Sequence, residues 1–274
     1  MTEIFIGEKI KIPSECFFLI AGPCVIENEK HTYFMAKNLK RITDELNIPF
    51  IFKSSYDKAN RLSIDSYRGP GIKEGLKILS NIKKELEIPV LSDVHETNQI
   101  ELAAEVLDVI QIPALLSRQT DLVVEAAKTN KPINLKKGQF LSPWNVKNIV
   151  EKALAQGNHS ILITERGTTF GYNNLVVDFK SIPIMKEFGF PVIIDATHAV
   201  QLPGAAGTSS GGNSKFTPHM AKAGIAVGAD GVFLEVHENP EKALSDGPNS
   251  LRLDELYSLL RELKKLYKLI NKRG

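Results

Sequence analysis

The amino-acid sequence predicts an α/β protein that folds as a (β/α)8 barrel with an N-terminal β-hairpin. Short apolar runs alternate along the chain with segments of helical periodicity. Each run is nearly continuous in apolar residues and rich in β-branched or aromatic side chains, which is typical of parallel strands buried on both faces. Eight such units in about 250 residues match a (β/α)8 barrel. The runs are FFLIAG, PFIFKSS, PVLSDV, DVIQIPA, PINLKK, SILITER, PVIIDAT and GVFLEV, which begin at residues 17, 49, 89, 108, 132, 160, 191 and 231.

The segments before and between these runs fit the same architecture. Residues 3–13, EIFIGEKIKIP, are expected to form a β-hairpin that closes the floor of the barrel. Proline opens several of the runs, as expected where a loop leads from a helix into a strand. Helical periodicity is clear in Glu29–Leu46, Ile72–Leu86, Asp121–Thr129, Val146–Ala155 and Leu253–Ile270.

One barrel domain is expected to cover residues 1–274, because no Ser- or Gly-rich linker and no block of like charge divides the chain. A doubly wound open sheet is the alternative. It would typically have fewer strands and a Gly-rich phosphate-binding turn after the first of them. The sequence that follows the first run, Ala21-Gly22-Pro23-Cys24, is not such a turn.

Composition and charge exclude several classes of protein. Hydrophobic residues make up 43% of the 274 residues and charged residues 24%, as in ordinary globular proteins. A net charge of +2 gives no argument for binding nucleic acid or a membrane surface. No apolar run reaches the ~18 residues of a membrane span, and the start does not resemble a secretory signal. Two cysteines make a disulfide framework improbable, and we expect a cytoplasmic protein.

Polar side chains gather at the C-terminal ends of the predicted strands, where barrel enzymes carry their active sites. Six cations among them need anions such as phosphate or carboxylate, although any one could instead form a structural ion pair. Because the chain has no P-loop or dinucleotide fingerprint, we expect a small phosphorylated metabolite with more than one anionic group. The six are Lys53, Lys58, Arg61, Arg118, Lys136 and Arg166.

A second set of strand-end residues could hold a metal ion. It follows the first, seventh and eighth strands, which are neighbours in a closed barrel. A thiolate, an imidazole and two carboxylates suit divalent zinc, iron or manganese, with room for water or a substrate oxygen. A buried, inert cysteine and hydrogen-bonding side chains are the alternative interpretation. The four residues are Cys24, His198, Glu235 and Asp246.

These residues lie in motifs that resemble the family of 3-deoxy-D-manno-octulosonate 8-phosphate synthases, also called 2-dehydro-3-deoxyphosphooctonate aldolases. The resemblance runs from about Phe18 to the last helix. The motifs are AGPC (21–24), FKSSYDKANR (52–61), SYRGPG (66–71), DVHE (93–96), IQIPALLSRQTDL (110–122), NLKKGQF (134–140), TERGTTFGYNNLVVD (164–178), DATHAVQLPG (195–204) and ALSDGP (243–248).

The resemblance implies a transferase that condenses phosphoenolpyruvate with D-arabinose 5-phosphate and water. The products are 3-deoxy-D-manno-octulosonate 8-phosphate and phosphate, in lipopolysaccharide Kdo biosynthesis. It also implies a homotetramer. Lys53, Lys136 and Arg166 match positions that hold the phosphate and carboxylate of phosphoenolpyruvate. Lys58 is expected nearby, and Gln111 is expected to line the same pocket.

The sugar phosphate has its own expected contacts. Asn60 and Arg61 match the motif that receives arabinose 5-phosphate in the family. Arg118 is implied to contact the phosphate of that sugar, in its own or a neighbouring subunit. Asp93 and His95 are expected to border the reacting carbons.

The family divides into members that need a metal and members that do not, and the residue at position 24 separates them. Cys24 resembles the metal-dependent group, in which it is expected to be a ligand and not a nucleophile. Asp246-Gly247-Pro248 is closer to the metal-independent pattern. Leu62 and Asp65 stand where the family usually has Ser and His. Leu62 removes a hydroxyl beside Arg61, so the affinity for the sugar is expected to differ.

Three other functions remain as alternatives. A sister enzyme condenses phosphoenolpyruvate with erythrose 4-phosphate, but it carries Lys-Pro-Arg-Thr where this chain has Lys58-Ala59-Asn60-Arg61. A sialic-acid synthase takes an unphosphorylated sugar and needs fewer cations. A non-catalytic phosphometabolite-binding barrel has no sequence feature in its favour.

Overall fold

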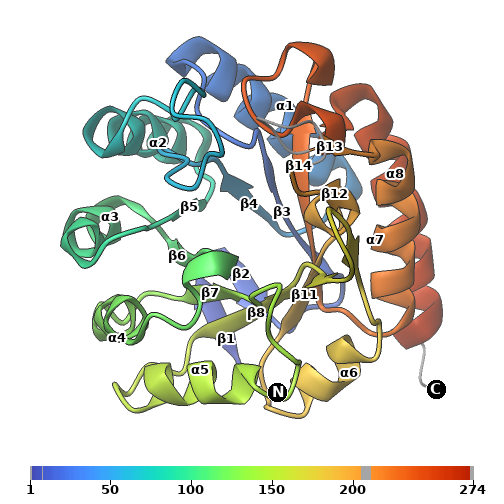
Figure 1. Ribbon diagram of the computed structural model, residues 1–274. Coiled ribbons are helices and arrows are strands. Elements are labelled where there is room, and N and C mark those ends of the chain that lie inside the picture. Colours follow the sequence, from blue (N-terminus) through green and yellow to red (C-terminus); the bar gives the residue numbers. More distant parts are fainter. Residues whose placement is uncertain (1, 8, 205–210, 272–274) are drawn as a thin grey trace.

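A computed structural model describes residues 2–7, 9–204 and 211–271. Eight parallel strands close into a barrel, because β14 pairs with both β3 and β11 (Figure 1). The predicted (β/α)8 fold is confirmed. The barrel strands are β3 (Phe18–Gly22), β4 (Phe50–Lys53), β5 (Val90–Asp93), β6 (Val109–Ile112), β7 (Ile133–Lys136), β8 (Ile161–Glu165), β11 (Val192–Asp195) and β14 (Gly231–His237).

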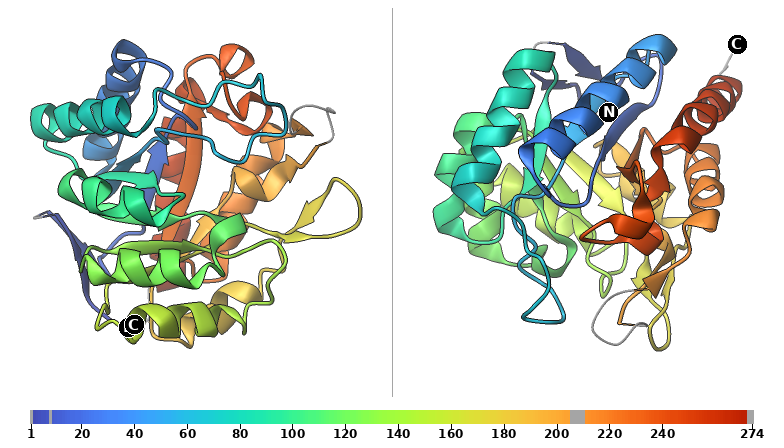
Figure 2. Two further views of the ribbon diagram at one scale, coloured as in Figure 1. Left: turned by 60° about the vertical axis from the view of Figure 1, so that its left-hand side comes forward. Right: turned by 90° about the horizontal axis from the view of Figure 1, so that it is seen from above.

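Helices surround the barrel (Figure 2) and bury their apolar faces against the outer face of the strands. They are α1 (Glu29–Leu46), α2 (Ile72–Leu86), α3 (Ile100–Val106), α4 (Thr120–Lys128), α5 (Val146–Leu154), α6 (Ser181–Lys186), α7 (Thr217–Ala226) and α8 (Leu253–Asn271). The predicted bounds of α1 and α2 are correct, those of α5 and α8 differ by one residue at the C-terminal end, and those of α4 differ by one residue at both ends. Asn28 explains where α1 begins, because its Oδ1 accepts a hydrogen bond from the His31 N–H at 2.9 Å.

Short elements lie in the connections. The strand pairs are β9 (Thr168–Thr169) with β10 (Leu175–Val176) and β12 (Gln201–Leu202) with β13 (Gly211–Gly212), while β15 (Leu251–Arg252) extends the sheet beside β14. Single turns of 3₁₀ helix are η1 (Thr97–Gln99), η2 (Ala114–Leu116), η3 (His198–Val200), η4 (Ser214–Phe216), η5 (Pro240–Lys242) and η6 (Gly247–Asn249). Among the described residues, no helix is both long and apolar enough to span a membrane.

The predicted N-terminal hairpin is present as β1 (Ile4–Ile6) and β2 (Ile10–Ile12), with Ile4 opposite Ile12. Its four isoleucines are buried in one cluster with residues that face the barrel interior, including Phe18, Ile51 and Val109 near the starts of their strands. The hairpin therefore closes the N-terminal end of the barrel, and the polar site is confined to the opposite end.

The N-terminal hairpin allows a test of this packing. Ile6 is completely buried, whereas Phe5 on the same strand is 61% exposed. Ile6→Ala should lower the free energy of unfolding by about 2–5 kcal/mol, because a cavity remains where the side chain was. Phe5→Ala should change it by less than about 0.5 kcal/mol. Urea unfolding of both variants measures this, and equal effects would contradict the assignment of Ile6 to the core.

Candidate active site at the C-terminal end of the barrel

A cavity of about 730 Å³ opens at the C-terminal ends of the strands, a size that suits a small-molecule ligand. Most of the residues predicted from the sequence line it. Cys24 and Glu235 are buried close by, within reach of Asp246 on the cavity wall. Arg118 is exposed and does not line the cavity, so a role in a neighbouring subunit stays a prediction. The lining residues predicted are Lys53, Lys58, Asn60, Arg61, Asp93, His95, Gln111, Lys136, Arg166, His198 and Asp246.

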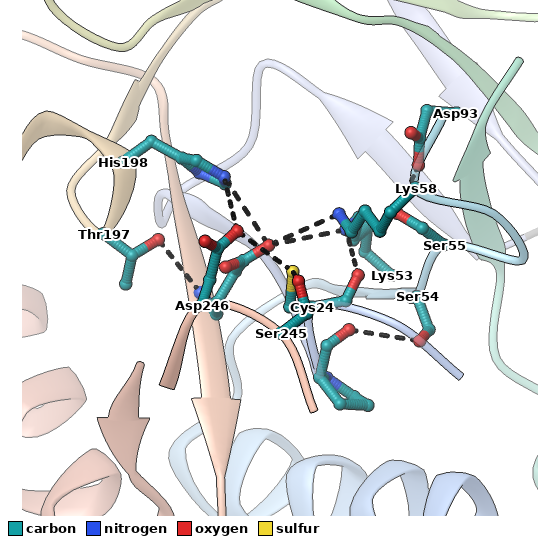
Figure 3. Close-up of polar contacts among 12 residues, drawn as sticks. Cys24, Lys53, Ser54, Ser55, Lys58, Asp93, Thr197, His198, Ser245 and Asp246 are labelled. Atoms are coloured by element: carbon teal, nitrogen blue, oxygen red, sulfur yellow. Dashed lines mark hydrogen bonds and ion pairs between the residues drawn. The ribbon is translucent and has the colours of Figure 1, made fainter. Parts of the chain in front are cut away.

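The four predicted metal ligands converge from the ends of three barrel strands, and Figure 3 labels Cys24, His198 and Asp246 of this set. Possible ligand atoms of Cys24, Glu235 and Asp246 all lie within 4.8 Å of one another. Cys24 Sγ is 3.2 Å from Asp246 Oδ2. His198 Nε2 lies 3.6 Å from Glu235 Oε1 and 4.0 Å from Asp246 Oδ2. The closure of β14 between β3 and β11 thus brings a sulfur, a nitrogen and two carboxylates to one point.

The surroundings of this cluster fit a divalent cation. Glu235 is fully buried, and neither of its carboxylate oxygens accepts a hydrogen bond from any described residue. Two lysines lie within 4.0 Å of Oε1 and offset part of the cost of burying the charge, but both oxygens keep lone pairs that a metal ion could use. Burial raises the pKa of the Cys24 thiol well above its ordinary value, and the carboxylates of Asp246 and Glu235 raise it further. Binding of a metal would therefore release the thiol proton.

Asp195 at the end of β11 connects the metal-capable set to the cationic set. Its Oδ2 lies 2.7 Å from His198 Nδ1 and also forms an ion pair with Lys136 Nζ. Burial alone would raise the pKa of Asp195, but His198 and Lys136 hold it well below its ordinary value. An ionised carboxylate on Nδ1 leaves Nε2 of His198 directed to Glu235 and Asp246, as in many metal-binding imidazoles.

Lys53 and Lys58 come from the end of β4 and the loop after it, and both point toward Glu235. Their Nζ atoms lie 3.6 Å and 4.0 Å from Glu235 Oε1. Lys53 Nζ also donates to the Cys24 carbonyl at 3.0 Å. Burial tends to lower the pKa of Lys58, but the nearby Cys24, Asp93, Glu235 and Asp246 groups raise it well above its ordinary value. Lys58 thus carries its charge into the cavity.

Lys136 and Arg166 form the second cationic wall. Burial lowers the pKa of Lys136 to about 8, and the positive charges of Lys53 and Arg166 oppose the stabilising effect of Asp195. Arg166 is 5% exposed, and its Nη1 has no hydrogen-bond partner among the described residues. Buried cations with unused donors favour an anionic ligand at this place.

Asp93 ends β5, and His95 lies beside it two residues later. His95 Nε2 is 2.9 Å from Asp93 Oδ2, and the other carboxylate oxygen accepts a hydrogen bond from the Ser55 hydroxyl. Burial alone would raise the pKa of Asp93, but His95, Lys58 and Lys53 together hold this pKa well below its ordinary value. The carboxylate therefore fixes the ring of His95 at the cavity wall.

Gln111 is held by a chain of hydrogen bonds that crosses three strands. Its Oε1 accepts from Asn134 Nδ2 at 2.9 Å, and Asn134 Oδ1 accepts from Thr164 Oγ1 at 2.6 Å. This chain leaves the amide NH₂ of Gln111 available at the cavity. The sequence prediction did not include Asn134 or Thr164, although their alternation with apolar neighbours indicates that they face inward.

Asn60 and Arg61 lie at the mouth of the cavity. Asn60 is exposed, and Arg61 Nη1 donates to Ser245 Oγ at 2.9 Å. The same hydroxyl is 3.0 Å from Cys24 Sγ. Ser245 thus connects the expected sugar site to the metal-capable cluster, and the sequence prediction did not include it. Leu62 also lines the mouth.

Gln201 is a further residue that the sequence prediction did not include. Its Oε1 accepts from Arg166 Nη2 at 3.0 Å, and its Nε2 donates to Asp246 Oδ1 at 3.3 Å. It therefore links the second cationic wall, at Arg166, to the metal-capable cluster. By contrast Lys137, which also follows β7, is directed away to the Leu141 carbonyl and the Thr168 hydroxyl.

The two cysteines allow a test of the metal-capable cluster. Demetallated protein titrated with Co²⁺ should develop the absorption of a cobalt–thiolate bond if Cys24 is the sulfur ligand, as predicted. Cys24→Ala should abolish this band, whereas Cys16→Ala should keep it, since Cys16 lies outside the cluster. A band that survives Cys24→Ala would overturn the ligand assignment.

Comparison with known proteins identifies the family. A family model described as the DAHP synthetase I family matches residues 3–272. A protein of Geobacter metallireducens named 2-dehydro-3-deoxyphosphooctonate aldolase is 58% identical over 262 residues, which are 96% of each chain. Proteins with the same name in Geotalea daltonii and Geobacter sulfurreducens are each 57% identical, over 96% of this chain and 97% and 96% of theirs. The resemblance expected from the motifs is confirmed, and the chain belongs to the DAHP synthetase I family.

Proposed function

We propose that the protein is a transferase that condenses phosphoenolpyruvate with D-arabinose 5-phosphate and water, releasing phosphate and 3-deoxy-D-manno-octulosonate 8-phosphate. The observation that carries this proposal is the convergence of five cations and a sulfur-containing metal-capable cluster on one cavity. The similar proteins named 2-dehydro-3-deoxyphosphooctonate aldolase support it. The product belongs to lipopolysaccharide Kdo biosynthesis, and we place the enzyme in the cytoplasm as a homotetramer.

The cationic walls bind phosphoenolpyruvate in this proposal. Lys53, Lys136 and Arg166 neutralise its phosphate and carboxylate, with Lys58 nearby and the Gln111 amide donating to the same ligand. Asn60 and Arg61 receive arabinose 5-phosphate at the mouth. Cations at these places offset the repulsion between the anionic substrates and stabilise the charge that develops as they react.

The reaction joins C3 of phosphoenolpyruvate to the aldehyde carbon of the sugar, and water adds at C2 before phosphate leaves by C–O cleavage. Holding both substrates in one orientation supplies much of the rate. His95 can move a proton at Nδ1, because Asp93 holds Nε2 and Nδ1 has no partner among the described residues. The chemistry needs no covalent intermediate on the enzyme.

The metal would be held by Cys24, His198, Glu235 and Asp246. This donor set fits zinc, iron or manganese. When bound, such an ion supplies Lewis-acid polarisation of a substrate or water oxygen. Asp195 keeps the imidazole of His198 oriented for this role.

The proposal predicts metal-dependent release of phosphate. Protein incubated with phosphoenolpyruvate and arabinose 5-phosphate should release phosphate, stop after removal of the metal by a chelator, and recover when a divalent ion is restored. Release that continues in protein shown by metal analysis to be metal-free would contradict a catalytic role for the ion. Release of phosphate from phosphoenolpyruvate with erythrose 4-phosphate, but not with arabinose 5-phosphate, would assign the chain to the sister activity.

A second prediction concerns Lys136. The value of kcat/KM for phosphoenolpyruvate should fall as the pH rises through about 8, because burial lowers the pKa of Lys136 to about 8 and the amine then loses its charge. Lys136→Met should lower kcat/KM by roughly 10²-fold at neutral pH and remove this alkaline decline. Lys147→Met, on an exposed pair with Glu151, is the control and should leave the profile unchanged. An alkaline limb that persists in Lys136→Met would contradict the assignment.

A further inference from the structure

Two histidines and two glutamates form a partly buried cluster outside the cavity, and the proposed reaction uses none of them. Glu27 follows β3, His31 lies in the first turn of α1, and His237 and Glu238 lie at the end of β14. The side chains of His31 and His237 are only 9% and 6% exposed, and their ring centroids are 4.7 Å apart. The cluster joins the first connection of the barrel to the last.

The hydrogen bonds of His237 favour one tautomer of its neutral ring. The backbone N–H of Asn239 donates to His237 Nδ1 at 2.9 Å, so in the neutral ring the proton lies on Nε2. Nε2 is 3.3 Å from Glu27 Oε1 and donates to it. His237 therefore holds the carboxylate of Glu27 from one side.

The same carboxylate oxygen holds the segment that carries a proposed metal ligand. Glu27 Oε1 accepts the backbone N–H of Leu244 at 2.9 Å, and the Leu244 carbonyl accepts from Arg61 Nη2 at 3.3 Å. The next two residues are Ser245 and Asp246, whose side-chain oxygens lie 3.0 Å and 3.2 Å from Cys24 Sγ. The position of Glu27 thus determines where this segment meets Cys24.

The composition of the cluster also suits a second metal ion, since atoms of Glu27, His31 and His237 lie within 4.8 Å of one another. The tautomer of His237 opposes that interpretation, because Nε2 carries the proton and Nδ1 already accepts from Asn239. His31 instead pairs with Glu238 at 2.8 Å and packs on the His237 ring. The geometry favours a hydrogen-bonded brace.

We propose that Glu27, oriented by His237, is a positioning residue for the divalent-metal site: it holds residues 244–246 so that Ser245 and Asp246 face Cys24. This inference rests on the proposed metal site. Carboxylates that orient ligands in this way typically change metal affinity by 10–100-fold when they are removed.

Metal affinity is the direct test. Demetallated full-length protein is titrated with Co²⁺ while the cobalt–thiolate absorption is followed. Glu27→Ala should raise the Kd roughly tenfold or more, with the same band at saturation because Cys24 is retained. Glu27→Gln should bind almost as the parent does, because its amide oxygen can accept both hydrogen bonds. His237→Ala keeps the Leu244 hydrogen bond, so its Kd should lie between those of the parent and Glu27→Ala.

Controls separate this role from a loss of fold. Glu241 lies on the same connection, but its carboxylate accepts from Arg252 Nη1 at 3.1 Å. The Glu241→Gln variant should therefore bind Co²⁺ as the parent does. Weaker folding alone would lower the fraction of binding protein without changing the Kd of the folded fraction.

An unchanged Kd in both Glu27→Ala and His237→Ala would overturn the inference. A second equivalent of metal that both variants lose would show a second metal site in place of the brace. A parent protein without the band would overturn the metal site itself.

Discussion

The buried carboxylate of Glu235 is the constraint on which the open end of the barrel depends. It is fully buried and receives no hydrogen bond from any described residue, while Lys53, Lys58 and His198 lie 3.6 Å, 4.0 Å and 3.6 Å from it. Removing an ion from water costs several kcal/mol unless opposite charge compensates. Metal-capable and anion-binding residues therefore share one electrostatic centre. A divalent cation at Glu235 would release both lysines to neutralise the anions of a substrate.

Closure of the barrel creates this centre from residues that are far apart in the sequence. β14 lies between β3 and β11, so Cys24, Glu235 and the residues after Asp195 meet at one rim. The N-terminal hairpin fills the opposite end with isoleucine. At the C-terminal rim, further carboxylates position the predicted ligands. Asp195 contacts the ring of His198, and Glu27 accepts a hydrogen bond from the connection that carries Asp246. Residues in loops are thus held by contacts with the strand ends and the first connection.

Much of this organisation could be predicted from the sequence, because parallel strands buried on both faces leave nearly continuous apolar runs. Strand ends then indicated the site, since a barrel gathers them at one rim. The helices α3, α6 and α7 were not predicted. Seven and six residues carry too little periodicity in α3 and α6, and the small and polar residues of α7 form no clear apolar stripe. Ser245, Gln201 and Glu27 could not be identified, since their roles depend on loop conformation. Arg118 is exposed outside the cavity of its own chain, so its predicted contact with the sugar phosphate would be made in a neighbouring subunit.

If the site works as proposed, metal and phosphoenolpyruvate occupy adjacent parts of one cavity. Crystals grown with Co²⁺ and phosphoenolpyruvate, measured at the cobalt absorption edge, test this most directly. We predict one strong anomalous peak about 2.3 Å from Cys24 Sγ and about 2.1 Å from His198 Nε2. The phosphate should lie against Lys136 and Arg166. A peak elsewhere with the Cys24 thiol unligated, or phosphoenolpyruvate bound away from these cations, would contradict the account.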